Sequence, residues 1–212
     1  MNTILTLSSF IFPLITFPYV SRILLPEGTG RVSFATSLVS YFLMLSQLGI
    51  PTYGIRACAK VRDDRRKLSR VVHELMAINL VMSLLSYLAL GIFVFAIPRL
   101  RAESSLIFII SLTILLNAVG MEWLYKALEQ YTYITIRSVI FKAIAVVAML
   151  LLIRQQSDYV VYGALTILAA SASNVCNFVH AHTYIDLFPE EKYNYRQHMK
   201  PILVFFAMSC AT

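Results

Sequence analysis

The chain has 212 residues, of which 58% are hydrophobic and 14% are charged, and its net charge is +7 at pH 7. A soluble domain carries about 25% charged residues, so this chain has too few charges to cover a water-facing surface. Its basic residues form no aromatic-interleaved patch of the kind that binds nucleic acid. The composition therefore excludes a soluble domain and predicts an all-α, polytopic membrane protein.

Six apolar runs follow one another, each long enough to cross the hydrocarbon core as a helix. The predicted spans are 4–25, 32–50, 75–97, 106–124, 134–153 and 159–179. The first span contains Pro13 and Pro18, which remove helical hydrogen bonds and are expected to kink it. The segment 26–30 contains Gly28 and Gly30, which are free to take positive φ, and it predicts a turn between the first two spans.

The last part of the chain predicts a loop and the start of another helix. Residues 188–200 are polar, and the apolar run 201–212 follows them. At 1.5 Å per residue this run reaches about 18 Å, which is short of the ~30 Å hydrocarbon core. The predicted organisation is one six-helix bundle over 1–187, a cytoplasmic loop over 188–200 and a truncated seventh helix over 201–212.

The basic residues predict how the chain is oriented. The stretch 56–70 holds seven of the 18 Lys and Arg residues. Short loops rich in Lys and Arg stay in the cytoplasm. If this stretch is cytoplasmic, alternation of the six spans places thirteen basic residues inside and five outside. The N-terminus is therefore also expected in the cytoplasm. No cleavable signal peptide is evident, so the first span is expected to be retained.

No catalytic, metal or cofactor motif is present. The sequence lacks HExxH, GxSxG, the phosphate-binding P-loop and GxGxxG. Four histidines lie at or beyond the predicted helix ends, without partners at metal-ligand spacing, and are interpreted as structural or solvated: His73, His180, His182 and His198. The three cysteines predict no disulfide and no metal site. We expect no cofactor, no metal and no catalytic residue.

Three charged residues form a possible cluster at the cytoplasmic end of the fourth span. Glu122, Lys126 and Glu129 are spaced at i, i+4 and i+7, which places them on one helix face if the helix continues that far. They are either a solvated, salt-bridged face or a charged patch that lines a cytoplasm-facing mouth.

Cations near or within the spans are the next candidates. Lys142 lies roughly 7 Å deeper than Arg137 along the fifth span, and its side chain either snorkels to the interface or lines a cavity. Arg22 and Arg56 lie at span ends, as interfacial anchors or as phosphate ligands, because guanidinium binds phosphate bidentately. No span carries an obvious central acid for a proton or Na⁺ site.

Polar side chains of the sixth span align on one face. Asn174, Asn177 and Tyr184 are spaced at i, i+3 and i+10. Such groups avoid hydrocarbon and face the interior of a bundle. They either join helices or form the wall of a hydrated cavity.

Three stretches resemble the polysaccharide or O-antigen flippase family, which belongs to a superfamily with multidrug-extruding and lipid II flippases. They are FPYVSRILLPEGTGRVSFA at 17–35, LGIPTYGIRACAKVRDD at 48–64 and EWLYKALEQYTYITIRSVIFK at 122–142. The resemblance covers essentially the whole chain, which would supply the first of two helical bundles.

The resemblance implies transport of undecaprenyl-diphosphate-linked oligosaccharides from the inner to the outer leaflet of the bacterial cytoplasmic membrane. It implies alternating access around a hydrated cavity, with one bundle rocking against the other. Arg22, Arg56, Arg137 and Lys142 become candidate contacts to the diphosphate, and Asn174 and Asn177 candidate cavity residues. The implied partners are the bilayer, the lipid-linked oligosaccharide, a polysaccharide polymerase and chain-length regulators.

Three other functions stay open at this point. A drug/cation antiporter would require a buried acid in an early span, and the first two predicted spans contain none. An integral-membrane enzyme of glycan assembly would require outer loops with His, Asp or Arg groups, and the outer loops are short. A non-functional fragment is the third.

Overall fold

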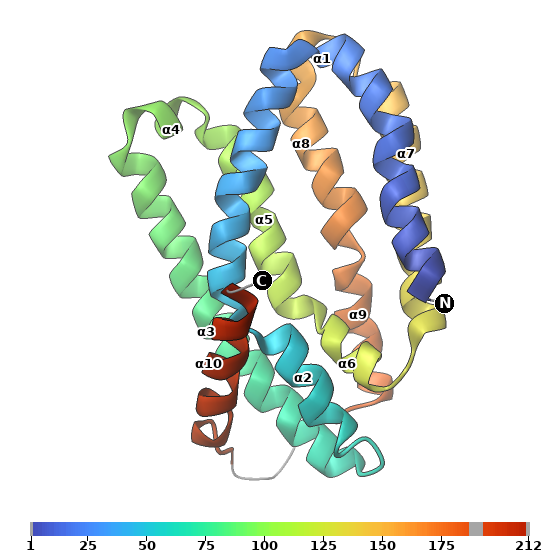
Figure 1. Ribbon diagram of the computed structural model, residues 1–212, viewed down its shortest axis with the longest axis vertical. Coiled ribbons are helices and arrows are strands. Elements are labelled where there is room, and N and C mark those ends of the chain that lie inside the picture. The colour runs from blue at the N-terminus through green and yellow to red at the C-terminus, as the bar shows by residue number, and fades with distance from the viewer. Residues whose placement is uncertain (1, 187–192, 211–212) are drawn as a thin grey trace. The chain divides into compact units, whose positions relative to one another are not determined.

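The computed structural model describes residues 2–186 and 193–210, and their side chains over 12–186 and 193–208. All regular secondary structure in these ranges is helical (Figure 1). Four segments within them are long and apolar enough to cross a membrane: Phe12–Ala59, Arg65–Ala96, Tyr131–Leu152 and Gln156–Thr183. The helical membrane architecture is confirmed, whereas the count of six spans and a truncated seventh stays a prediction.

The longer helices are α1 (Asn2–Gln47), α3 (Arg65–Ala96), α5 (Ser104–Gly120), α7 (Tyr131–Leu152) and α10 (Arg196–Cys210). The shorter helical elements are α2 (Ile50–Ala59), α4 (Pro98–Ala102), α6 (Glu122–Ala127), η1 (Gln156–Asp158), α8 (Tyr159–Ile167), η2 (Leu168–Ala172), α9 (Asn174–His180) and η3 (Ala181–Thr183). Helix α10 begins five residues before the predicted start at 201. Helix α3 begins ten residues before its predicted start at 75.

Helix α1 consists of two arms that meet at Leu25, where φ is 56° and ψ is 176°. A residue that precedes proline disfavours the helical region, and Pro26 suits the first turn of the second arm. Figure 1 shows the chain reversing direction at this point. The predicted turn over 26–30 is therefore wrong, because these residues are already helical. Gly28 instead allows close packing: a Cβ atom there would lie 3.1 Å from the Cβ of Leu24.

Two further interruptions end the helices of predicted spans. Leu48 and Gly49, with φ of 44° and 75°, separate α1 from α2, and Met121, with φ of 42°, separates α5 from α6. The predicted spans 32–50 and 106–124 thus end as helices at Gln47 and Gly120. Gly49 is needed for its positive φ and for space, because a Cβ atom would lie 2.6 Å from the backbone nitrogen of Phe206.

The chain forms two compact units. Unit 1 comprises the described parts of 1–41, 89–113 and 131–173, and unit 2 comprises those of 42–88, 114–130 and 174–212. The predicted single bundle over 1–187 stays a prediction. The five basic residues predicted to lie outside all belong to unit 1, and the basic stretch 56–70 belongs to unit 2.

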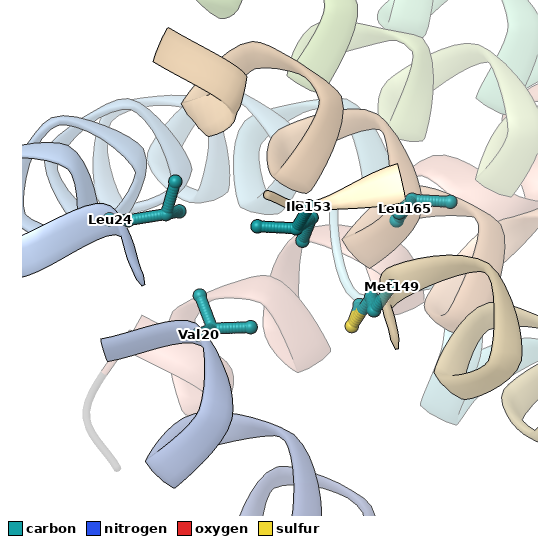
Figure 2. Close-up of a cluster of buried hydrophobic side chains, with 5 residues drawn as sticks. All are labelled: Val20, Leu24, Met149, Ile153 and Leu165. Atoms are coloured by element: carbon teal, nitrogen blue, oxygen red, sulfur yellow. The ribbon is translucent and has the colours of Figure 1, made fainter. Parts of the chain in front are cut away.

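The core of unit 1 joins the first arm of α1 to α7 and α8. Figure 2 shows this cluster of buried side chains: Val20, Leu24, Met149, Ile153 and Leu165. The hydroxyl of Tyr19 donates to the carbonyl oxygens of Leu150 and Ile153, at 3.2 and 3.0 Å. These carbonyls lie at the end of α7, where no further helical N–H is available to them.

In unit 2, α2 packs on α6 and on α10. Gly54 makes the first contact possible, because a Cβ atom there would lie 2.9 Å from the ring of Trp123.

In unit 1, α7 presents an apolar stripe that protein does not cover: Ile136, Ile140, Ile144, Val147 and Leu151. Each of these five is more than half exposed, as expected for a face in contact with lipid tails.

The basic stretch contains the cap of α3. The Asp64 carboxylate accepts hydrogen bonds from the backbone N–H groups of Arg66 and Lys67, at 3.1 and 3.2 Å. Its other oxygen lies 3.1 Å from the Lys67 ammonium. The backbone N–H of Lys67, followed by its side chain, lowers the pKa of Asp64 below its ordinary value.

Gly49→Ala is expected to lower the free energy of unfolding by about 1–3 kcal/mol, because it strains a left-handed backbone. Displacement of α10 adds to this cost. Gly91→Ala is the matched control, since Gly91 lies within α3 and a Cβ atom added there would have no neighbouring atom within 4 Å. The control is expected to change stability by less than about 1 kcal/mol. Unfolding in mixed micelles measures both, and equal effects would contradict the assignment.

Asp64→Ala is expected to accelerate amide hydrogen exchange at the start of α3 at neutral pH. The folded-state pKa is lowered, so the carboxylate stabilises this end above the unfolded Asp pKa of about 3.9. The stabilisation is lost as the pH falls through the folded-state pKa, and the difference between variant and parent should vanish there. Asp63→Ala removes the same charge from an exposed neighbour and should leave α3 unchanged. A difference that persists at acid pH would contradict the cap.

Candidate functional site

Unit 2 contains a polar cavity of about 250 Å³, here called the amide cavity. Its wall includes Trp123 and five uncharged polar side chains: Gln47, Thr52, Asn79, Asn117 and Asn174. Glu122 and Lys126 add one charge of each sign. The cavity lies where α1 and α5 end, because Gln47 and Gly120, the last residues of those helices, also line it.

Gly120 allows Asn174 to reach this wall. A Cβ atom at Gly120 would lie 2.5 Å from the Cγ atom of Asn174, so a larger residue would displace that side chain. Asn174 then donates from Nδ2 to Asn117 Oδ1 at 3.2 Å. The structure therefore brings the predicted Asn174 together with the predicted Glu122 and Lys126.

Two buried polar atoms of this wall have no hydrogen-bond partner among the described residues: Asn79 Oδ1 and Trp123 Nε1. Asn79 is 3% exposed, and its Nδ2 donates to the carbonyl oxygen of Ala118 at 3.2 Å. An unsatisfied buried donor or acceptor costs about 1–3 kcal/mol. The wall thus holds one buried acceptor and one buried donor without a partner among the described residues.

The predicted charged cluster forms in part. Glu122 and Lys126 make an ion pair of 2.9 Å on α6, and both side chains are about 40% exposed. Glu129 is not on this helix face, because α6 ends at Ala127 and Glu129 has a φ of 58°. Its carboxylate pairs with Arg62 at 3.1 Å instead.

Asn177 joins helices rather than lining the cavity. It is fully buried, and its Nδ2 donates to the carbonyl oxygen of Gly120 at 2.6 Å. This carbonyl lies at the end of α5, where the helix supplies no donor. The hydroxyl of Tyr125 donates to the carbonyl oxygen of Asn177 at 2.6 Å, which closes the same contact from α6.

Unit 1 contains a second cavity of about 250 Å³, here called the lysine cavity. Its described lining residues are apolar apart from three hydroxyl side chains and one cation: Phe12, Pro13, Thr16, Lys142, Met149, Tyr162, Thr166, Ala169 and Ala170. Two of the hydroxyls are engaged as donors, because Thr16 donates to Phe12 O and Thr166 donates to Gly163 O. Lys142 is the charged residue of the described lining. Its role in binding stays a prediction.

The wall of the lysine cavity includes an irregular turn of the sixth predicted span. The predicted span 159–179 lies within the candidate span Gln156–Thr183, and its helix contains a π-helical turn, η2 (Leu168–Ala172). Such turns are frequent at functional sites. Arg137 is buried and donates from Nη1 to the carbonyl oxygen of Ser173 at 2.8 Å, so it supports the end of η2.

The remaining predicted cations line neither cavity. Arg22 is exposed on α1. Arg56 is exposed on α2, and its guanidinium carbon lies 4.9 Å from the ring centroid of Phe205 on α10.

Asn79 and Asn117 were not among the predicted site residues. The signal for both was an amide inside an apolar run, which is costly in hydrocarbon and therefore points to the protein interior. Glu74 was also missed, and His198 was interpreted as structural or solvated. The two are buried together in unit 2, and the signal of Glu74 was weaker because the predicted third span began one residue after it.

Long apolar helices with an uncovered stripe, and polar groups held inside, define a multi-pass helical membrane protein. The family model described as "Polysaccharide biosynthesis protein" matches residues 1–210, and the chain belongs to this family. The resemblance to polysaccharide flippases is thereby confirmed.

A relative described as "Putative O-antigen transporter" from Escherichia coli (strain K12) is 21% identical over 156 residues. The match covers 74% of this chain and 38% of the relative, so the chain spans well under half of that protein's length. No solved structure matches the chain.

Asn177→Ala is expected to lower the free energy of unfolding by about 1–3 kcal/mol, because the buried Gly120 carbonyl loses its donor. Glu122→Gln is the matched control and should change stability by less than about 1 kcal/mol, since an exposed ion pair contributes little. Thermal unfolding in detergent, followed by the fluorescence of the single tryptophan, Trp123, measures both. An unchanged Asn177→Ala variant would contradict the role of this side chain.

Proposed function

We propose that this chain takes part in moving undecaprenyl-diphosphate-linked oligosaccharides from the inner to the outer leaflet of the bacterial cytoplasmic membrane. Family membership supports polysaccharide transport. The observation that carries the finer proposal is Lys142, a cation among cavity-lining residues that are otherwise uncharged where the structure describes them.

The lysine cavity has the chemistry of a site for a lipid anion. An ammonium group binds phosphate oxygens as a point charge, and in a low-dielectric wall this attraction is stronger than in water. The hydroxyls of Thr16 and Thr166 already donate their hydrogens to backbone carbonyls, so they are not donors to the phosphate. Phe12 and Met149 offer apolar surface to an isoprenoid chain.

The amide cavity has the chemistry of a site for sugar. Amide side chains both donate and accept, which matches sugar hydroxyls, and Trp123 adds an aromatic surface. Asn79 Oδ1 and Trp123 Nε1 are a buried acceptor and a buried donor of this wall without a partner among the described residues. We propose that Asn174 orients this wall and that the Glu122–Lys126 pair lies at its charged rim.

Arg22 and Arg56 are proposed as further phosphate contacts, because both guanidinium groups are exposed and can bind phosphate bidentately. Arg137 is proposed to support η2 rather than to bind cargo, since it already donates to Ser173. Alternating access, with a polymerase and chain-length regulators as partners, belongs to the same proposal.

The test is binding of undecaprenyl diphosphate to the full chain in nanodiscs, measured by native mass spectrometry. Lys142→Ala is expected to weaken binding by about 10- to 100-fold, the equivalent of one charge-assisted hydrogen bond. Lys142→Arg keeps the charge and should retain most of the affinity. Neutral undecaprenol should bind equally to all three proteins.

Arg22→Ala tests the exposed position in the same assay and is expected to have a smaller effect than Lys142→Ala. Binding of the diphosphate to Lys142→Ala with the parent affinity would overturn the proposal for the lysine cavity.

A further inference from the structure

Unit 2 holds a carboxylate that neither cavity uses. Glu74, on α3, has no exposed surface. Its Oε2 atom lies 2.6 Å from His198 Nε2 and accepts a hydrogen bond from Gln197 Nε2 at 2.8 Å. Its Oε1 atom accepts from Arg70 Nε at 3.1 Å and from the backbone N–H of Asn194. A buried carboxylate is tolerable only with such a set of donors.

His198 continues this network to a third helix. Its side chain is 4% exposed, and its second ring nitrogen, Nδ1, lies 2.8 Å from the hydroxyl of Tyr53 on α2. The two rings meet edge to face, with centroids 5.6 Å apart. The chain Tyr53–His198–Glu74, here called the relay, therefore ties α10 to both α2 and α3.

The chemistry of the relay allows two protonation states of His198. An ionised Glu74 can only accept, so His198 Nε2 carries a hydrogen in both states. When His198 is neutral, Nδ1 accepts the hydrogen of the Tyr53 hydroxyl. When His198 takes a second proton, Nδ1 becomes a donor, and the Tyr53 oxygen accepts. The contact with Glu74 then changes from an ion–dipole bond to a bond between opposite charges, which is stronger.

We propose that the relay is a proton-binding site, and that uptake of one proton by His198 tightens the attachment of α10 to α2 and α3. The attachment is strongest at acid pH while Glu74 stays ionised, and it weakens as the pH rises and His198 loses the proton. Because the attachment of α10 then depends on one proton, a change in pH shifts the equilibrium between conformations with α10 attached and with α10 released.

Other charged and titratable groups from α2 and α3 lie around the relay. From α3, the Nε atom of Arg70 lies 3.1 Å from Glu74 Oε1, and the Arg70 side chain is 31% exposed, so it is partly hydrated. From α2, Tyr53 is within the relay and Cys58 is buried beyond it. Arg56, also from α2, lies over Phe205 of α10.

A second histidine, His73, precedes the relay residue Glu74 on α3. His73 Nε2 is 2.9 Å from the carbonyl oxygen of Asp186, whose carboxylate pairs with Arg65 at 2.9 Å. His73 therefore contacts the segment before α10 and not the relay, and it needs its own control. The relay residues Tyr53, Glu74 and His198 line neither the amide cavity nor the lysine cavity, so this inference does not depend on the cargo.

The experiment is amide hydrogen exchange of α10 in the full chain in nanodiscs, from about pH 5 to pH 8, where imidazole titrates. After correction for intrinsic exchange, protection of the α10 amides is expected to fall by about five- to tenfold as the pH rises, in a transition that involves one proton. Amides of α7, which belongs to unit 1, serve as the internal reference. Protection of α10 that does not change with pH would overturn the proposal.

Glu74→Gln keeps the size and polarity of the side chain but removes its charge, and it should abolish the transition. His73→Gln and His182→Gln should leave the transition in place. A transition that persists unchanged in Glu74→Gln, or that disappears in His73→Gln, would assign the proton elsewhere.

Nitrogen NMR of labelled histidines in the parent chain keeps the proposal testable if Glu74→Gln does not fold. His198 is expected to hold a hydrogen on Nε2 throughout, while Nδ1 titrates across the same pH range. A neutral His198 that carries its hydrogen on Nδ1 would overturn the proposal.

Discussion

Backbone hydrogen bonding in hydrocarbon is the constraint on which this structure depends, because a bare carbonyl or N–H has no water there to satisfy it. At three helix ends or interruptions, side chains from other helices cover such groups. Asn177 donates to the last carbonyl of α5, Arg137 to the carbonyl of Ser173 after η2, and Tyr19 to carbonyls at the end of α7. Much of the polar chemistry inside this membrane protein serves its own backbone.

The two cavities follow from the same interruptions. The amide cavity lies where α1 and α5 end, and the lysine cavity includes the π-helical turn η2 in its wall. A helix that stops or widens leaves space that its neighbours do not fill. The Asn79 amide lies at such a space, with its Oδ1 atom buried and without a partner among the described residues. The groups that we propose to bind cargo are therefore distinct from Asn177, Arg137 and Tyr19, which bond to the backbone.

Glu74 is a charged group whose burial depends in the same way on hydrogen bonds from other parts of the chain. Its carboxylate is buried because donors from α3, from α10 and from the segment before α10 converge on it. The position of α10 consequently depends on electrostatics as well as on apolar packing, and apolar packing alone would not respond to a proton. Gly49 lies at the same contact between α2 and α10, where a Cβ atom would meet the backbone nitrogen of Phe206 at 2.6 Å.

The amino-acid sequence by itself determined the helical membrane class, the family, the approximate helices and the Glu122–Lys126 pair, because these depend on local spacing and composition. It also marked Asn174, Asn177, Arg137 and Lys142 as polar residues within apolar runs. Only the tertiary structure decided which of them bond to backbone and which line a cavity. The reason is that helical periodicity defines a face but not its neighbour: Asn177 meets a carbonyl 57 positions away, and Glu74 meets a histidine 124 positions away.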